Sequence, residues 1–124
     1  MCARLLIADD EKDTLALLQY RLELKGYEID VCSNGGEALD RILEKPYDLV
    51  LMDYFMPILK GDVVCQGIRS EERLQALPII IITGFSERTE EFFKERGATD
   101  VVYKPCDIDE IVAKVTKYIG ESVA

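Results

Sequence analysis

The sequence predicts an α/β fold, a doubly wound five-stranded parallel sheet with five helices. Short apolar segments typical of buried strands alternate five times with longer segments whose apolar residues follow a helical period. Strands that alternate with helices of this length pair in parallel, and right-handed crossovers place the helices on both faces of the sheet. The 124 residues are enough for one sizeable core, so we expect a single domain over residues 1–124.

The five strands are short, and each ends near a turn or a polar residue. Leu49–Asp53 is apolar up to its terminal carboxylate, which is typical of a strand buried on both faces in the middle of a parallel sheet. Glu28–Cys32 alternates between polar and apolar residues, which indicates a strand nearer the edge. In chain order the strands are expected at residues 4–9, 28–32, 49–53, 78–83 and 101–105.

The helices are identified by their apolar periodicity and by their caps. Leu15, Leu18 and Leu22 form a helical stripe in the first. Asn34 and Glu37 form a capping box at the start of the second. Gly26 is expected to end the first helix. Ser86 is expected to cap the fourth helix and Gly97 to end it, and Asp107 with Glu110 forms a second capping box at the start of the fifth. In chain order the helices are expected at residues 12–25, 35–45, 62–72, 87–97 and 108–119.

The composition excludes several classes of function. The net charge of −9 argues against a domain that grips nucleic acid directly. The chain has no histidine, which removes Ser–His and Cys–His nucleophile pairs and His-ligated metals. Its four cysteines include no CxxC pair, so we expect neither a zinc cage nor a redox pair. No apolar stretch is long enough to cross a bilayer and no signal peptide is recognisable, so we expect a cytoplasmic protein without membrane contact.

Charged and hydroxyl side chains follow four of the predicted strands. They are Asp9, Asp10, Asp53, Thr83 and Lys104, at the sheet edge where open α/β folds place their ligand sites. Three neighbouring carboxylates repel one another, and a divalent cation relieves that repulsion. Oxygen ligands without histidine or cysteine favour Mg²⁺, or Mn²⁺ as a similar ion. Together with a lysine and a hydroxyl they suit phosphoryl transfer, with Asp53 as the nucleophile that forms an acyl phosphate.

This set of residues resembles the receiver domain of two-component response regulators. The matching residues are Asp9-Asp10, Asp53, Met56-Pro57 with Gly61, Thr83-Gly84 and Lys104-Pro105, together with Asn34-Gly35 before Glu37-Ala38-Leu39. The resemblance covers essentially the whole chain. It implies a flavodoxin-like receiver fold with strand order 2-1-3-4-5 and a function in phosphorelay signal transduction.

The resemblance implies a role for each site residue. Asp53 would accept a phosphoryl group from a histidine kinase or a histidine phosphotransfer protein. Asp10, Asp53 and the backbone carbonyl of Phe55 would ligate Mg²⁺ directly, and Asp9 would act mainly through a metal-bound water. Lys104 would hold a phosphoryl oxygen. The chain would then be no enzyme in the usual sense, because it would catalyse only its own aspartyl phosphorylation and dephosphorylation.

The resemblance also implies a conformational switch. Thr83 would move toward the phosphoryl group, and Tyr103 would turn inward behind it. The bond between Lys104 and Pro105 would be cis. The change would be read out on the face formed by the fourth helix, the last strand and the fifth helix, by a downstream effector or by a second copy of the chain.

A partner surface is expected beside the acidic cluster. Leu17 and Tyr20 fall off the apolar stripe of the first helix, so apolar surface is exposed there. In the family the kinase or phosphotransfer helix docks at this place, along with the loop that holds Cys106 here. Ordinary partial exposure explains the same residues equally well.

Three other functions remain open at this stage. A small-molecule aspartyl phosphatase usually has a second acid two residues after its nucleophile, where this chain has Phe55. A flavin or nucleotide binder needs a phosphate-cradling loop after the first strand, and Asp9-Asp10-Glu11 would repel a phosphate. A degenerate receiver would act only as a binding module, and the complete residue set argues against it.

Overall fold

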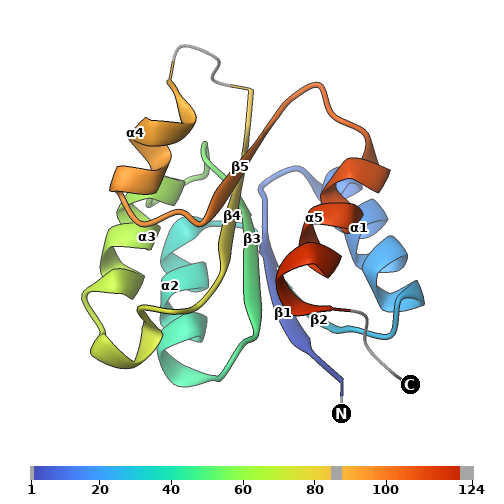
Figure 1. Ribbon diagram of the computed structural model, residues 1–124, viewed down its shortest axis with the longest axis horizontal. Helices are drawn as coiled ribbons and strands as arrows, with labels where there is room; N and C mark the ends of the chain where they lie inside the picture. The colour runs from blue at the N-terminus through green and yellow to red at the C-terminus, as the bar shows by residue number, and fades with distance from the viewer. Residues whose placement is uncertain (1, 85–87, 121–124) are drawn as a thin grey trace.

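The centre of the computed structural model, which describes residues 2–84 and 88–120, is a five-stranded parallel sheet (Figure 1). Its strands are β1 (Arg4–Ala8), β2 (Glu28–Cys32), β3 (Leu49–Asp53), β4 (Ile79–Thr83) and β5 (Asp100–Tyr103). They pair in the order β2-β1-β3-β4-β5, which is the predicted order. The alternating strand β2 lies at one edge, as its pattern predicts, and the wholly buried β3 lies in the middle.

Five α-helices cover the two faces of the sheet (Figure 1). Helices α1 (Lys12–Leu24) and α5 (Ile108–Ile119) lie together on one face. Helices α2 (Gly35–Glu44), α3 (Gly61–Arg69) and α4 (Glu90–Glu95) lie on the other. A short 3-10 helix, η1 (Glu72–Leu74), follows α3. No helix in the part of the chain that the structure describes is long and apolar enough to cross a membrane.

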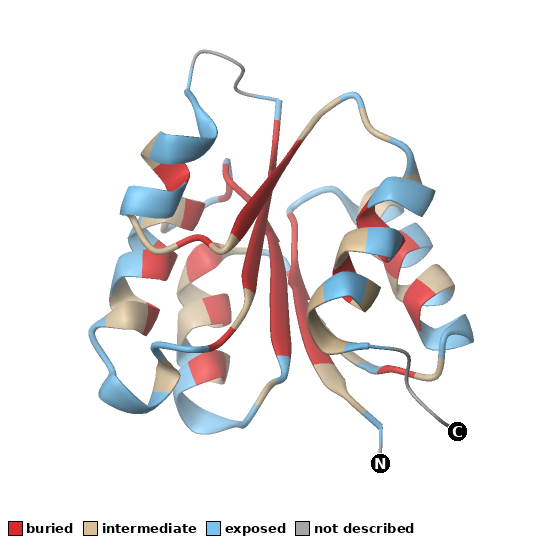
Figure 2. Cartoon of the chain, viewed as in Figure 1, coloured by how far each residue is buried: buried red, intermediate tan, exposed pale blue. Residues whose placement is uncertain are grey.

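The strands contribute side chains to two hydrophobic cores, one on each face of the sheet, because successive side chains of a strand point to opposite faces. In β3, Val50 and Met52 pack into the core under α2, α3 and α4. Leu49 and Leu51 pack into the core under α1 and α5. Figure 2 shows the burial running along the strands and over the helix surfaces that face the sheet. Both cores are closed without the polar strand-end residues, so those residues are available for a site.

The helix boundaries that differ most from the prediction are those of α3 and α4, while the others agree within one residue. Helix α3 ends at Arg69, not at residue 72. The Arg69 guanidinium donates to the carbonyls of Leu74 and Gly97, at 2.6 and 2.9 Å, and so turns the chain toward η1. Helix α4 begins at Glu90 with Thr89 as its N-cap, while the expected cap Ser86 lies outside the described residues.

Of the two predicted capping boxes, the first is half formed and the second is absent. Asn34 caps α2 by accepting the backbone N–H of Glu37 at 2.8 Å, but the Glu37 carboxylate pairs with Arg41, one turn further on. At the start of α5, Asp107 makes no side-chain cap bond, so the capping box predicted there is wrong. The Asp107 backbone carbonyl instead accepts the N–H groups of Glu110 and Ile111, at 3.0 and 3.3 Å.

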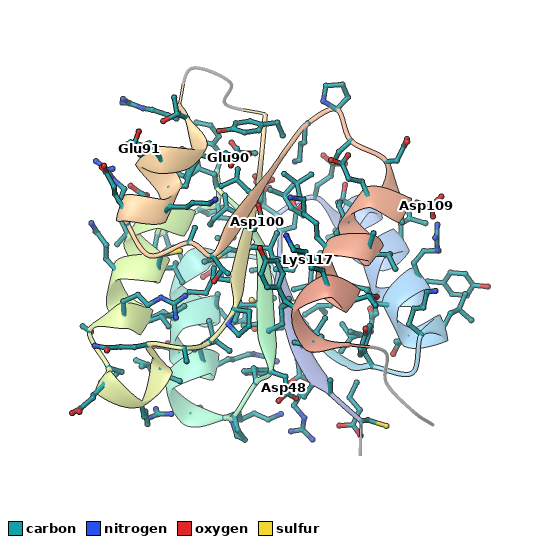
Figure 3. The ribbon with its side chains drawn as sticks, in the orientation of Figure 1. Asp48, Glu90, Glu91, Asp100, Asp109 and Lys117 are labelled. Atoms are coloured by element: carbon teal, nitrogen blue, oxygen red, sulfur yellow. The ribbon has the colours of Figure 1, made fainter. Side chains whose placement is uncertain are left out.

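A buried carboxylate at the start of β5 ties this edge strand to α5. Asp100, labelled in Figure 3, accepts hydrogen bonds from Lys114 Nζ at 3.0 Å and from the Tyr118 hydroxyl at 2.7 Å. The N–H of Val101 donates to the same carboxylate at 2.8 Å. Burial raises the pKa of Asp100, but the hydrogen bonds from Tyr118 and Lys114 outweigh burial and hold that pKa below its ordinary value. The charged form therefore stabilises the folded chain.

Replacing Asp100 by asparagine should lower the free energy of unfolding by about 1–3 kcal/mol at pH 7, because Lys114 would lose its anionic partner in a mostly buried site. The folded-state pKa of Asp100 lies below its unfolded value. Its contribution is therefore present above about pH 4 and is lost as the pH falls through the folded-state pKa. Urea unfolding from pH 7 down to pH 3 measures this.

Asp40→Asn is the matched control, because Asp40 is an exposed aspartate on α2. Its stability should stay within about 0.5 kcal/mol of wild type. Equal stability of Asp100→Asn and wild type at pH 7 would contradict the account of β5.

Candidate functional site

The predicted site residues meet at the edge of the sheet where the strands end, the upper edge in Figure 1. Asp9 and Asp10 follow β1 directly, and Asp53 is the last residue of β3. Thr83 ends β4, and Lys104 follows β5. Since all five strands are parallel, chain segments far apart in sequence deliver these side chains to one place.

Three carboxylates form the centre of this site. Asp9, Asp10 and Asp53 each offer an oxygen, and these oxygens all lie within 4.8 Å of one another. Asp9 is 2% exposed and Asp53 7% exposed, whereas Asp10 faces solvent. Residues 2–84 and 88–120 contain no other such cluster of three potential metal-binding side chains.

Within the cluster, Asp9 is the carboxylate whose pKa is raised. Burial raises the pKa of Asp9 to about 6, and the neighbouring charge of Asp53 adds to the effect. The backbone N–H of Glu11, which donates to Asp9 Oδ1 at 2.9 Å, and the charge of Lys104 act in the opposite direction. The surroundings of Asp9 therefore disfavour its charged form, chiefly through burial.

Lys104 supplies the cation that contacts Asp53. Its Nζ lies 2.9 Å from Asp53 Oδ2, and both side chains are more than half buried. Burial lowers the pKa of Lys104, but the hydrogen bond and charge of Asp53 outweigh burial, so the pKa is raised. Lys104 is thus charged throughout the neutral range. The peptide bond to Pro105 is cis, as the resemblance implies.

Thr83 and Tyr103 are neighbours in adjacent strands. They are register partners in the pairing of β4 with β5, and the Lys104 N–H donates to the Thr83 carbonyl at 2.8 Å. Thr83 is fully buried. Tyr103 is half-buried, and its hydroxyl donates to the backbone carbonyl of Arg88 at 2.7 Å, on the segment that leads into α4.

The loop between β3 and α3 brings backbone close to Asp53. A Cβ at Gly61 would lie 3.0 Å from the Asp53 carbonyl oxygen, so a larger residue there would crowd the start of α3 against the site. The Gly61 N–H donates to the Tyr54 carbonyl at 2.8 Å. Within the loop, Ile58 has φ +74°, which is strained for a β-branched residue. The 47% exposed Phe55 lies on this loop.

Two features of the site had no sequence signal. The Glu11 N–H that binds Asp9 is a backbone group, which residue type does not reveal. The ring of Tyr54 packs edge-on against Phe93 of α4, with ring centroids 5.2 Å apart, a contact between elements 39 positions apart in the chain. The apolar character of both residues was the only available hint.

The donor set fits a hard divalent cation. Three carboxylate oxygens converge, two of the acids are buried, and one lysine does not balance three negative charges. Oxygen-only ligation of this kind is what Mg²⁺ prefers. Burial is the main cause of the raised pKa of Asp9 and the charge of Asp53 adds to it, so a bound cation would favour the charged form of Asp9.

Two of the three residues expected at a partner surface share a groove. Leu17 of α1 and Cys106 after β5 line a mostly apolar groove of about 330 Å³, whose floor includes Ile82 and Ile111. Leu17 is 47% exposed. Tyr20, 62% exposed, lies one turn further along α1 and is not among the lining residues. Lys104 also lines this groove, so the groove adjoins the acidic cluster.

Comparison with known proteins agrees with the geometry. A family model for the response regulator receiver domain matches residues 5–116. The chain belongs to this family.

Response regulator ArlR of Staphylococcus epidermidis is 35% identical over 112 residues, which cover 90% of this chain and 50% of the relative. The phosphate regulon transcriptional regulatory protein PhoB of Rhizobium meliloti is 34% identical over 116 residues, which cover 93% and 51%. This receiver chain therefore spans about half the length of the curated relatives it matches.

Solved receiver structures share the fold. The response regulator TrrA of Thermotoga maritima, in complex with Mg²⁺-BeF, superposes with a TM-score of 0.82 at 36% identity, over 94% of this chain and 98% of that one. The receiver domain of Francisella response regulator 1452 gives a TM-score of 0.86 at 28% identity, over 94% and 95%. The receiver chain thus takes part in two-component signalling.

Replacing Asp9 by asparagine should raise the free energy of unfolding by about 1–3 kcal/mol at pH 7.5 in EDTA. The folded-state pKa of about 6 lies above the ordinary 3.8, so wild type loses stability as the pH rises through that window. Asparagine removes this loss and keeps an oxygen for the Glu11 N–H. The gain should shrink as the pH is lowered toward 4 in urea unfolding.

Asp13→Asn is the control, because Asp13 is exposed on the first turn of α1. It should leave stability nearly unchanged. Added Mg²⁺ should stabilise wild type and the control more than Asp9→Asn. A metal-free Asp9→Asn chain less stable than wild type at pH 7.5 would contradict the electrostatic account of the cluster.

Proposed function

We propose that this receiver is a cytoplasmic phosphorelay switch that accepts a phosphoryl group on Asp53. The observation that carries the proposal is the environment of Asp53: a buried carboxylate bonded to Lys104 at 2.9 Å, with the oxygens of two further acids within 4.8 Å. The chain would catalyse only its own phosphorylation and dephosphorylation. Its phosphodonor would be a histidine kinase or a histidine phosphotransfer protein.

The transfer step uses residues of this chain as nucleophile and electrostatic support. An Asp53 carboxylate oxygen attacks phosphorus, a P–O bond forms, and the bond from phosphorus to the donor nitrogen breaks. The electron pair of that bond stays on the donor imidazole. Lys104 moves from the carboxylate to a phosphoryl oxygen, where its fixed charge stabilises the transition state. The Thr83 hydroxyl would orient another phosphoryl oxygen.

The acids around Asp53 would hold Mg²⁺. Asp10, Asp53 and the backbone carbonyl of Phe55 are the proposed direct ligands, and Asp9 would bind a water on the metal. When bound, the ion would neutralise phosphoryl oxygens and offset the repulsion among the carboxylates. Asp9 also orients the loop, because it anchors the N–H of Glu11.

Thr83 and Tyr103 would carry the response away from the site. Thr83 would move toward the phosphoryl group, and the Tyr103 ring would change its packing behind it. The Tyr103 hydroxyl already contacts the segment that enters α4. The resulting population shift would be read on the α4, β5 and α5 face by an effector or a second copy of the chain.

The apolar groove between α1 and the loop after β5 suits a phosphodonor. Leu17 and Cys106 line the groove beside Lys104, and the exposed Tyr20 extends the apolar surface along α1. The apolar face of a helix from a kinase or phosphotransfer protein would bind in this groove. Its phosphorylated histidine would then lie near Asp53.

Intact-mass measurement after incubation with acetyl phosphate and Mg²⁺ tests the function. The wild-type receiver should gain the mass of one phosphoryl group, because the small donor needs only the catalytic site. EDTA should abolish the gain by removing the metal. Asp53→Asn should not gain the mass, whereas Asp40→Asn, the matched exposed control, should gain it like wild type.

Two other outcomes would contradict the proposal. No gain in wild type, under conditions that label a known receiver, would leave a binding module as the function. Sustained release of inorganic phosphate at many turnovers per minute, with small phosphate esters as substrates, would indicate a small-molecule phosphatase.

A further inference from the structure

Helix α4 is attached to the residue after Asp53 by a row of rings. The row is formed by Phe55, Tyr54, Phe93 and Phe92, and we call it the aromatic row. Tyr54 lies 4.7 Å from Phe55 and 5.2 Å from Phe93, between ring centroids, in edge-to-face geometry. Phe93 lies 5.1 Å from Phe92 in the same geometry. Tyr54 and Phe93 are both buried, so the central contact is a packed one.

Two arginines pack against Phe92, the ring of the aromatic row that is farthest from Phe55 along the row. The guanidinium carbons of Arg96 and Arg88 lie 3.6 and 4.6 Å from the Phe92 ring centroid. Arg96 also donates to the Phe92 carbonyl at 3.0 Å. Its Nε lies 3.9 Å from Asp62 Oδ2 on α3. Helix α4 and its C-cap Arg96 therefore contact α3 through Asp62 and the residue after β3 through Tyr54.

The same helix is fixed on its other side by the proposed switch residue. The Tyr103 hydroxyl binds the Arg88 carbonyl, and the Arg88 side chain lies against Phe92. Contacts thus run from Tyr54 through Phe93, Phe92 and Arg88 to Tyr103. A movement of α4 driven from Tyr103 would therefore act on Phe93, the residue that packs against Tyr54.

In this arrangement Asp53 and Lys104 are in direct contact. Asp53 Oδ2 accepts the Lys104 ammonium directly at 2.9 Å, in the place where a phosphoryl group would have to come between them. The aromatic row is therefore part of the packing that accompanies direct contact between Asp53 and Lys104.

We propose that the Tyr54–Phe93 contact is a latch that holds α4 in this arrangement and opposes switching. The proposal rests on the proposed function. In addition to the proposed movement of Thr83, Tyr54, the residue next to the phosphoacceptor, would control the position of α4. The strength of the latch sets the fraction of unphosphorylated molecules whose α4 has already switched.

The size of the effect follows from the ring geometry. An edge-to-face aromatic pair corresponds to about a two- to tenfold change in an equilibrium constant. A ligand that binds only the switched arrangement has an apparent affinity proportional to the fraction of molecules in that arrangement. Removing the Tyr54 ring should therefore strengthen binding of such a ligand by about two- to tenfold.

Titration of Tyr54→Leu with beryllium fluoride at saturating Mg²⁺ tests the latch. The apparent affinity should rise about two- to tenfold over wild type, while the affinity for Mg²⁺ alone stays unchanged. Phe92→Leu, which weakens the row from α4 itself, is the second variant and should shift the affinity in the same direction. In the NMR spectrum, backbone amides of Glu90–Glu95 should move toward their positions in the beryllium fluoride complex before any is added.

Tyr47→Leu is the matched control. It makes the same chemical change at a tyrosine that binds Asp30 beside the edge strand, away from α4, and should keep the wild-type affinity. Wild-type or weaker affinity in Tyr54→Leu and Phe92→Leu would overturn the latch alone, and so would an equal rise in Tyr47→Leu. A wild-type chain that binds no beryllium fluoride would overturn the proposed function and the latch with it.

Discussion

Repulsion among Asp9, Asp10 and Asp53 is the constraint on which the rest of this receiver depends. Their oxygens converge within 4.8 Å, and burial together with the charge of Asp53 raises the pKa of Asp9 to about 6. Lys104 is the cation in contact with Asp53. The fold sustains this unfavourable cluster because both hydrophobic cores lie beneath it, on either face of β3, and do not depend on it. The carboxylate cluster thus lowers the stability of the fold at the site where its negative charge would bind a metal ion.

The loops around the site are fixed by backbone contacts. The Glu11 N–H binds Asp9, and the Gly61 N–H binds the Tyr54 carbonyl, so the ends of β1 and β3 meet helix N-termini directly. The strained φ of Ile58 lies in the same β3–α3 loop. Rigid placement of this kind lowers the cost of organising charged groups at the moment of phosphoryl transfer. It also links the phosphoacceptor to α4, because Tyr54 follows Asp53 immediately and packs on Phe93.

The sequence predicted the sheet and the convergence of the site residues, but not the contacts between helices. Parallel strands end at one edge, so Asp53 and Lys104 could be placed together from their positions after apolar runs. The end of α3 depends on where the Arg69 side chain finds carbonyl groups, which no local pattern encodes. The partners of Asp100 and the ring contacts of Tyr54 likewise depend on packing between distant elements.

Mapping the labelled residue tests the central claim most directly. The receiver is incubated with acetyl phosphate and Mg²⁺, reduced with sodium borohydride, which converts an acyl phosphate to the alcohol, and analysed by peptide mass spectrometry. The account predicts reduction at Asp53 alone, because only that carboxylate combines burial with direct contact to Lys104. Reduction at Asp9 or Asp10, or a stable phosphate on a hydroxyl such as Thr83, would contradict it.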